Sequence, residues 1–166
     1  MATKDNLQAA FAGESQANRK YTAFAKKADE EGLTQVAKLF RAAAEAETLH
    51  ALMHFRVMGG VKSTAENVQA AVDGEGYEYK KMYPDFLREA KKEDNPGAME
   101  SFGLALQVEK VHHALYSKAL EAVKSGKDAP AAAIWVCGHC GNTVVGEPPK
   151  TCPVCGRPRE MFFEVK

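Results

Sequence analysis

The segment Phe40-Arg-Ala-Ala-Ala-Glu-Ala-Glu47-Thr-Leu-His50 is the most informative part of this chain about its fold. In a helix, residues three or four apart share one face, so the apolar stripe that begins at Phe40 and Ala43 runs into Glu47 and His50. An ionised carboxylate that is buried without a partner costs several kcal/mol. A carboxylate and an imidazole in a core-facing stripe therefore predict a helical bundle with a cation in its core.

This design is repeated within the chain. The second copy is Phe102-Gly-Leu-Ala-Leu-Gln-Val-Glu109-Lys-Val-His112, and residues 6–14 likewise resemble residues 67–75. Each half is interpreted as a helix pair in which one glutamate precedes a Glu-x-x-His. The six candidate metal ligands are Glu14, Glu47, His50, Glu75, Glu109 and His112. One Glu-x-x-His often arises by chance, but two in repeat register predict a four-helix bundle of approximate twofold symmetry with a two-metal carboxylate site.

Helix-forming residues and turn signals divide most of the chain into four helices. These are expected at about residues 4–31, 34–58, 63–94 and 96–126, with glycine stops after the first two. The third helix is expected to bend or divide near Gly74, Gly76 and Pro84. The predicted organisation is an all-α bundle over residues 1–127, a linker over residues 128–133, and a small loop-rich metal domain over residues 134–166.

Composition excludes several classes of function. The chain has 166 residues with 22 basic and 22 acidic side chains, so no net positive charge indicates nucleic-acid binding. The sequence has no run of about 18 apolar residues that could cross a membrane, and it does not open on a signal-like segment. We therefore expect a soluble, cytoplasmic protein without nucleic-acid or membrane partners.

The four cysteines form two Cys-x-x-Cys pairs, Cys137 with Cys140 and Cys152 with Cys155. Four thiolates at this spacing can surround one metal ion tetrahedrally, and a cytoplasmic chain favours such a site over disulfides. The spacing alone fits both a one-iron Fe(Cys)4 centre and a structural zinc site.

The internal symmetry breaks at Glu78. This residue lies one turn after Glu75 on the same face, whereas its counterpart in the first half is Ala17. A seventh ligand beside one metal predicts coordination that changes with oxidation state, because hard oxygen donors suit ferric iron better than imidazole does. The alternative is a solvated charge beside Lys80 and Lys81.

Taken together, these motifs resemble those of the rubrerythrins over nearly the full length of the chain. The motifs are Gly13-Glu14-Ser15, Glu47-Thr-Leu-His50, Gly74-Glu75 with Glu78 before Met82-Tyr83-Pro84, Glu109-Lys-Val-His112, and the two cysteine pairs with Cys152-Pro-Val-Cys155-Gly156. The resemblance implies a ferritin-like bundle with two irons, followed by a rubredoxin-like domain with one iron. Asn142 departs from the family, in which an aromatic residue often follows this Cys-Gly, but iron remains favoured over zinc.

The resemblance also implies roles for the ligands. The glutamates of the two Glu-x-x-His pairs would bridge the irons, and the two preceding glutamates would be terminal ligands. His112 would bind one iron permanently, whereas the other iron would exchange His50 for Glu78 between the reduced and oxidised states. Such a protein reduces hydrogen peroxide to water in oxidative-stress defence. Electrons would come from an external reductase or a rubredoxin through the Fe(Cys)4 centre, and a head-to-tail homodimer could bring one tail to its partner's bundle.

Two other functions fit the same residues. One is a ferroxidase or O2-consuming oxidase at the same di-iron site. The other is a metal-binding or storage protein whose cysteine domain is a structural zinc ribbon. Relative rates with peroxide and O2 separate the first alternative from a peroxidase, and the visible spectrum with metal analysis separates the second.

Overall fold

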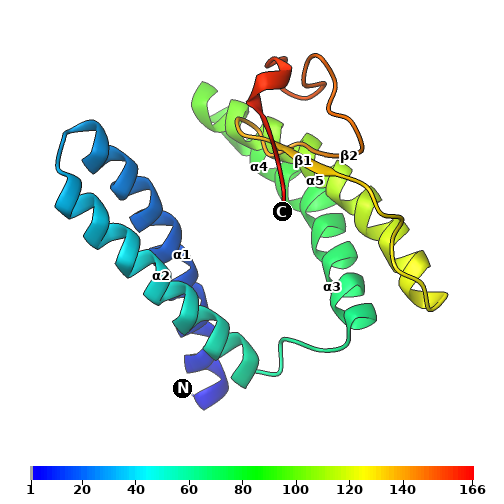
Figure 1. Ribbon diagram of the computed structural model, residues 1–166, viewed down its shortest axis with the longest axis horizontal. Helices are drawn as coiled ribbons and strands as arrows, with labels where there is room; N and C mark the ends of the chain where they lie inside the picture. The colour runs from blue at the N-terminus through cyan, green and yellow to red at the C-terminus, as the bar shows by residue number, and fades with distance from the viewer. Residues whose placement is uncertain (1) are drawn as a thin grey trace. The chain divides into compact units, whose positions relative to one another are not determined.

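The computed structural model describes residues 2–166, so Met1, the first residue of the predicted bundle domain, lies outside the described residues. The described chain divides into two compact units, one ending at Lys62 and one beginning at Ser63. Each unit has its own helix hairpin, and the second also contains the cysteines (Figure 1).

The first hairpin consists of α1 (Thr3–Glu30) and α2 (Thr34–Val57). Buried alanines spaced seven residues apart, Ala37, Ala44 and Ala51, let α2 approach α1 closely. Buried Asn18 of α1 fixes the register, because its side-chain amide donates to the carbonyl of Ala44 at 2.7 Å. The turn between the helices passes through Gly32 at φ 76°, the left-handed conformation that glycine adopts without strain.

The second hairpin consists of α3 (Thr64–Tyr77), the π-helix η1 (Glu78–Met82), α4 (Tyr83–Lys92) and α5 (Pro96–Lys124). The first three segments form one helical run that pairs with α5 (Figure 1). Ser63 opens α3 with a capping box, and the Asn95 side chain caps α5 by accepting from the amide of Ala98. The predicted irregularity in the third helix takes the form of a π turn that begins at Glu78. Single π turns of this kind occur frequently at functional sites.

The cysteine module, residues 134–166, contains a three-stranded antiparallel sheet. Its strands are β1 (Ile134–Cys137), β2 (Thr143–Val145) and β3 (Phe162–Glu164), in the order β2-β1-β3, and the short 3-10 helix η2 (Arg159–Met161) precedes β3. The module has its own small core, in which Cys137, Cys152 and Phe162 are buried and Trp135 packs against them. The β2 strand contacts α5 of the same unit.

Across residues 2–166, none of the helices combines the length and the apolar character that crossing a lipid bilayer demands.

Candidate metal centres

The first hairpin brings three of the predicted ligands together. One donor atom each from Glu14, Glu47 and His50, the first triad, lie within 4.8 Å of one another. Nδ1 of His50 lies 2.9 Å from Oε2 of Glu47, as expected for residues three apart on one helical face. The His50 side chain is 53% exposed, so it has room to move away from the site.

The second hairpin gathers the repeat counterparts in the same way. Glu75, Glu109 and His112, the second triad, also place one donor atom each within 4.8 Å. Nδ1 of His112 lies 2.8 Å from Oε2 of Glu109 and 3.9 Å from Oε1 of Glu75. Burial, a hydrogen bond to Glu109, and the negative charges of Glu109 and Glu78 raise the pKa of Glu75 to about 7. A cation among these carboxylates would stabilise the ionised form of Glu75 and offset the effects of burial and like charge, so the second triad fits a metal ion.

Glu78 belongs to neither triad among the described residues. It nevertheless lies close to the second one, since burial and the charge of Glu109 raise the pKa of Glu78 while His112 lowers it. Tyr83, one turn further on, is in the same environment, because burial and the charges of Glu78, Glu109 and Glu75 raise the pKa of its hydroxyl. The unmatched glutamate is therefore near the second triad, on a π turn.

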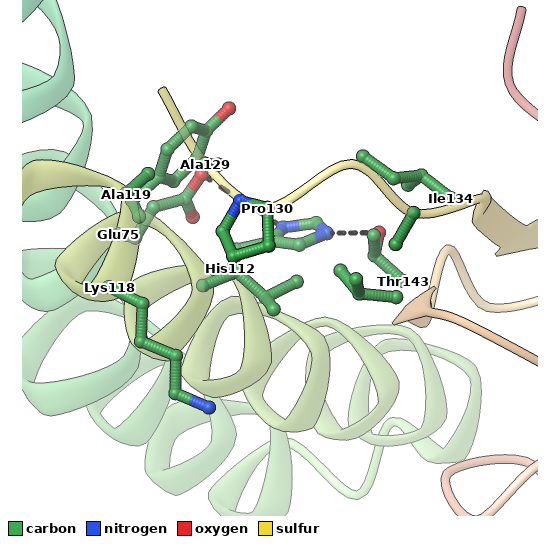
Figure 2. Close-up of a pocket in the computed structure, with 12 residues that line it drawn as sticks. Glu75, His112, Lys118, Ala119, Ala129, Pro130, Ile134 and Thr143 are labelled. Atoms are coloured by element: carbon green, nitrogen blue, oxygen red, sulfur yellow. Dashed lines mark hydrogen bonds and ion pairs between the residues drawn. The ribbon is translucent and has the colours of Figure 1, made fainter. Parts of the chain in front are cut away.

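His112 is also anchored on its other side. Its Nε2 lies 2.9 Å from Oγ1 of Thr143, which belongs to strand β2 of the cysteine module (Figure 2). The Thr143 hydroxyl is 3.3 Å from the carbonyl oxygen of Gly141 and can donate to it, which leaves Oγ1 free to accept from Nε2–H. A proton on Nε2 leaves the lone pair on Nδ1, the nitrogen that faces the two glutamates, free for a metal.

A cavity of about 630 Å³ adjoins this contact. Glu75, His112 and Thr143 contribute polar atoms, whereas Leu115, Pro130 and other apolar side chains from α5 and the following segment form much of the wall (Figure 2). The second triad therefore borders a space of ligand size with few polar groups.

The four cysteine sulfurs form a cluster of tetrahedral dimensions. Sγ of Cys137 lies 3.7 Å from Sγ of Cys155, and Sγ of Cys140 lies 3.6 Å from Sγ of Cys152. Metal–sulfur bonds of about 2.3 Å in a regular tetrahedron require sulfur–sulfur distances of about 3.8 Å, so the cluster fits one metal ion. Burial opposes ionisation of Cys137, but backbone hydrogen bonds from Cys140 and His139 outweigh it and lower the pKa of the Cys137 thiol to about 7.

Two family models match this chain. The rubrerythrin model covers residues 5–120, and the model of the rubrerythrin rubredoxin-like domain covers residues 135–163. The chain belongs to the rubrerythrin family. Among its relatives is nigerythrin of Nitratidesulfovibrio vulgaris, which is 35% identical over 97% of this chain and 85% of that protein. Rubrerythrin of Porphyromonas gingivalis is 34% identical over 99% of this chain and 90% of its own.

Solved structures agree with this assignment. A structure described as the fully reduced, all-ferrous state of nigerythrin matches with a TM-score of 0.59 at 34% identity, covering 99% of this chain and 87% of that one. Family membership confirms the predicted fold class, a ferritin-like helical protein with a C-terminal rubredoxin-like domain. It also confirms the predicted cofactors, a di-iron carboxylate site and a rubredoxin-like metal site made of four cysteines. As a member of this family the chain is an oxidoreductase.

Sequence reasoning missed Thr143. Its hydroxyl contacts a candidate ligand 31 residues away in the chain, and no local pattern marks it. The π turn was also missed, since only a bend or a break was expected there.

Proposed function

We propose that this protein is a di-iron peroxidase that reduces hydrogen peroxide to water with electrons relayed through an Fe(Cys)4 centre in the cysteine module. The reaction consumes one peroxide, two protons and two electrons and releases two waters. When bound, the two irons supply the electrons that break the O–O bond. Stress defence in the cytoplasm, an external reductase or rubredoxin as electron donor, and a homodimeric state belong to the same proposal.

The observation that carries this proposal is the hydrogen bond between His112 and Thr143. It links a candidate iron ligand to the strand that follows the first cysteine pair, within a single chain. Such a link favours a two-site redox enzyme, whose centres must exchange electrons, over a storage protein or a structural zinc ribbon. Because both residues belong to one chain, this route for electrons does not need a second subunit.

The roles of the ligands follow from the two triads. We assign Glu47 and Glu109 as bridging ligands and the glutamates of α1 and α3 as terminal ones. His112, held on both sides of its ring, is the permanent ligand. His50 is the ligand that Glu78 replaces on oxidation, which agrees with the greater exposure of its side chain.

The test is single-turnover reaction of the fully reduced protein with peroxide, and separately with O2. We expect reoxidation by peroxide to be at least about 10-fold faster than by O2 at equal concentrations. Glu47→Ala should abolish the fast phase, while Glu45→Ala, an exposed position on the same helix, should leave it unchanged. Unchanged peroxide turnover in Glu47→Ala would refute the assignment, and a faster reaction with O2 would favour the oxidase.

The zinc alternative has an independent test. Aerobically purified protein with an Fe(Cys)4 centre should show a visible thiolate-to-iron band that bleaches on reduction, together with one iron per cysteine module. Zinc in the module with no such band would leave the di-iron site without this internal electron relay.

A further inference from the structure

The cavity beside the second triad is much larger than hydrogen peroxide requires. Its volume is about 630 Å³. One water molecule takes up about 30 Å³ of the liquid, and hydrogen peroxide, with two oxygen atoms, needs roughly twice that space. Cavities of about 300 to 1,000 Å³ are those in which proteins bind small organic molecules. The volume therefore fits a substrate that carries a carbon skeleton.

Two candidate metal ligands of the second triad line this cavity. Oε1 of Glu75 lies 3.9 Å from Nδ1 of His112, and both residues belong to the wall. Thr143, whose hydroxyl lies 2.9 Å from Nε2 of His112, belongs to the same wall. A molecule in the cavity could therefore place a polar group beside the candidate metal site while the rest of the molecule extends away from it.

The wall that leads away from the triad is apolar. Leu115 and Ala119 follow His112 on α5 by three and seven residues, so the wall extends about 10 Å along the helix axis at about 1.5 Å per residue. Ile134 and Val145, which face each other across strands β1 and β2, also line the cavity and are 42% and 49% exposed. An apolar group in the cavity would remove this surface from water, which favours binding.

The opposite wall is the segment between α5 and β1, and it is held in place. The amide of Gly146, just after β2, donates to the carbonyl of Ala133 at 2.8 Å. Pro130 lies over His112, and Lys118 of α5 points its amine away from both of them (Figure 2). A charged group carried into such apolar surroundings without a partner is strongly disfavoured. The cavity therefore suits a neutral molecule with an apolar tail.

We propose that this cavity binds the apolar tail of a neutral organic hydroperoxide, so that the protein reduces alkyl and aryl-alkyl hydroperoxides as well as hydrogen peroxide. In the reaction the O–O bond breaks. The oxygen bonded to carbon becomes an alcohol and the terminal oxygen becomes water, with two electrons from the reduced protein and two protons. The inference rests on the proposed peroxidase function and adds a class of substrate to it.

The first measurement compares three substrates in single-turnover reactions of the fully reduced, iron-loaded protein. These are hydrogen peroxide, tert-butyl hydroperoxide and cumene hydroperoxide. We expect the reaction with cumene hydroperoxide to saturate at a concentration at least about 10-fold lower than the reaction with tert-butyl hydroperoxide, because the phenyl group buries more apolar surface.

Two substitutions that fill the cavity separate the substrates. Ala119→Phe places a ring in the cavity from α5, and Ala132→Phe does so from the segment before β1. Each should lower the second-order rate constant for cumene hydroperoxide by at least about 10-fold and change that for hydrogen peroxide by less than about 2-fold. Ala114→Phe and Ala131→Phe, at exposed positions outside the wall, are the matched controls and should leave both rate constants unchanged.

A binding measurement tests the cavity without turnover. The oxidised, iron-loaded protein is titrated calorimetrically with 2-phenyl-2-propanol, the alcohol that cumene hydroperoxide yields. We expect one site per chain with a negative heat-capacity change, the mark of buried apolar surface. Either cavity variant should weaken this binding by at least about 5-fold, and the two controls should not. An unchanged rate with hydrogen peroxide shows that a variant is folded.

The outcomes separate this inference from the function on which it rests. Turnover of hydrogen peroxide without turnover of cumene hydroperoxide would overturn the inference and leave the peroxidase proposal standing. A rate with cumene hydroperoxide that neither cavity variant lowers would do the same. Protein that binds the alcohol but reacts with neither peroxide would refute the peroxidase proposal, and with it the substrate inferred from the cavity.

Discussion

The two hairpins carry the same triad, but they hold its histidine differently. The His50 side chain is 53% exposed and its one hydrogen-bond partner within the described residues is Glu47, whereas the His112 side chain is 27% exposed and is held by both Glu109 and Thr143. The second hairpin also has the π turn at Glu78, where the first has Ala17 in a regular helix. The repeat therefore supplies three candidate metal ligands in each hairpin, but only the second hairpin holds its histidine on both sides of the ring.

The largest difference between the two hairpins is expected when each histidine is removed in turn. His112→Ala should weaken the affinity of the di-iron site for iron by at least about 100-fold in both oxidation states, because an anchored ligand is lost. His50→Ala should weaken iron binding only in the reduced protein, since in the proposed exchange Glu78 takes the place of His50 after oxidation. Iron content measured after equilibration under reducing and oxidising conditions checks both. Equal losses in all states would show that the two histidines are equivalent.

The unmatched glutamate offers the next largest effect. Glu78→Ala should slow peroxide turnover by about 10-fold or more while leaving ferrous iron binding close to that of the parent protein, because in the proposed exchange the glutamate binds only on oxidation. Glu93→Ala, an exposed position at the end of α4, serves as the matched control. Stopped-flow reoxidation and ferrous titration separate the two effects. Weakened ferrous binding would place Glu78 among the permanent ligands.

The Thr143 contact tests the anchoring itself. Thr143→Val keeps the shape of the side chain but removes the hydroxyl, and it should cost about 10-fold in the rate of electron transfer from the iron of the cysteine module to the pair. Thr143→Ser should restore the rate, because it retains the hydroxyl group. Thr151→Val, an exposed position in the same module, should behave like the parent protein. Rates come from the bleaching and recovery of the visible band after peroxide addition. A rate insensitive to Thr143→Val means that the hydroxyl has no part in the transfer.

The smallest predicted effect is on the stability of the metal-free protein, and it comes from Glu75 in the second hairpin. Glu75 has a pKa raised from 4.5 to about 7, so the folded state holds its proton more tightly than the unfolded state does. Its contribution to the free energy of unfolding is complete below about pH 4.5 and is lost as the pH rises through about 7. Urea unfolding of chelated protein should therefore show stability falling across this range, and Glu75→Gln should flatten the slope. A slope unchanged by Glu75→Gln would show that the raised pKa belongs to another group.

Much of the site could be predicted from local patterns. The spacing of three between Glu47 and His50 places both on one helical face whatever the rest of the molecule does, and the structure brings them together at 2.9 Å. The same holds for Glu109 and His112, at 2.8 Å. The roles of these ligands and the domain boundaries at residues 127 and 134 stay predictions.

The irregular part of the third helix was only half foreseen. Gly74, Gly76 and Pro84 suggested a bend, but the π turn occupies Glu78–Met82 between them. A π turn inserts a residue into the helical hydrogen-bond ladder, and no composition rule locates it within one turn. Its position matters because it decides where the Glu78 carboxylate lies relative to the second triad.

The two triads, the thiolate cluster and the repeat that relates the hairpins could be predicted from residue order alone, because helical periodicity and Cys-x-x-Cys spacing are local properties. The hydrogen bond between Nε2 of His112 and Thr143, 31 residues further along the chain, is set by the folded arrangement of the chain. That contact depends on how strand β2 packs on α5, and packing between distant segments leaves no trace in short-range spacing.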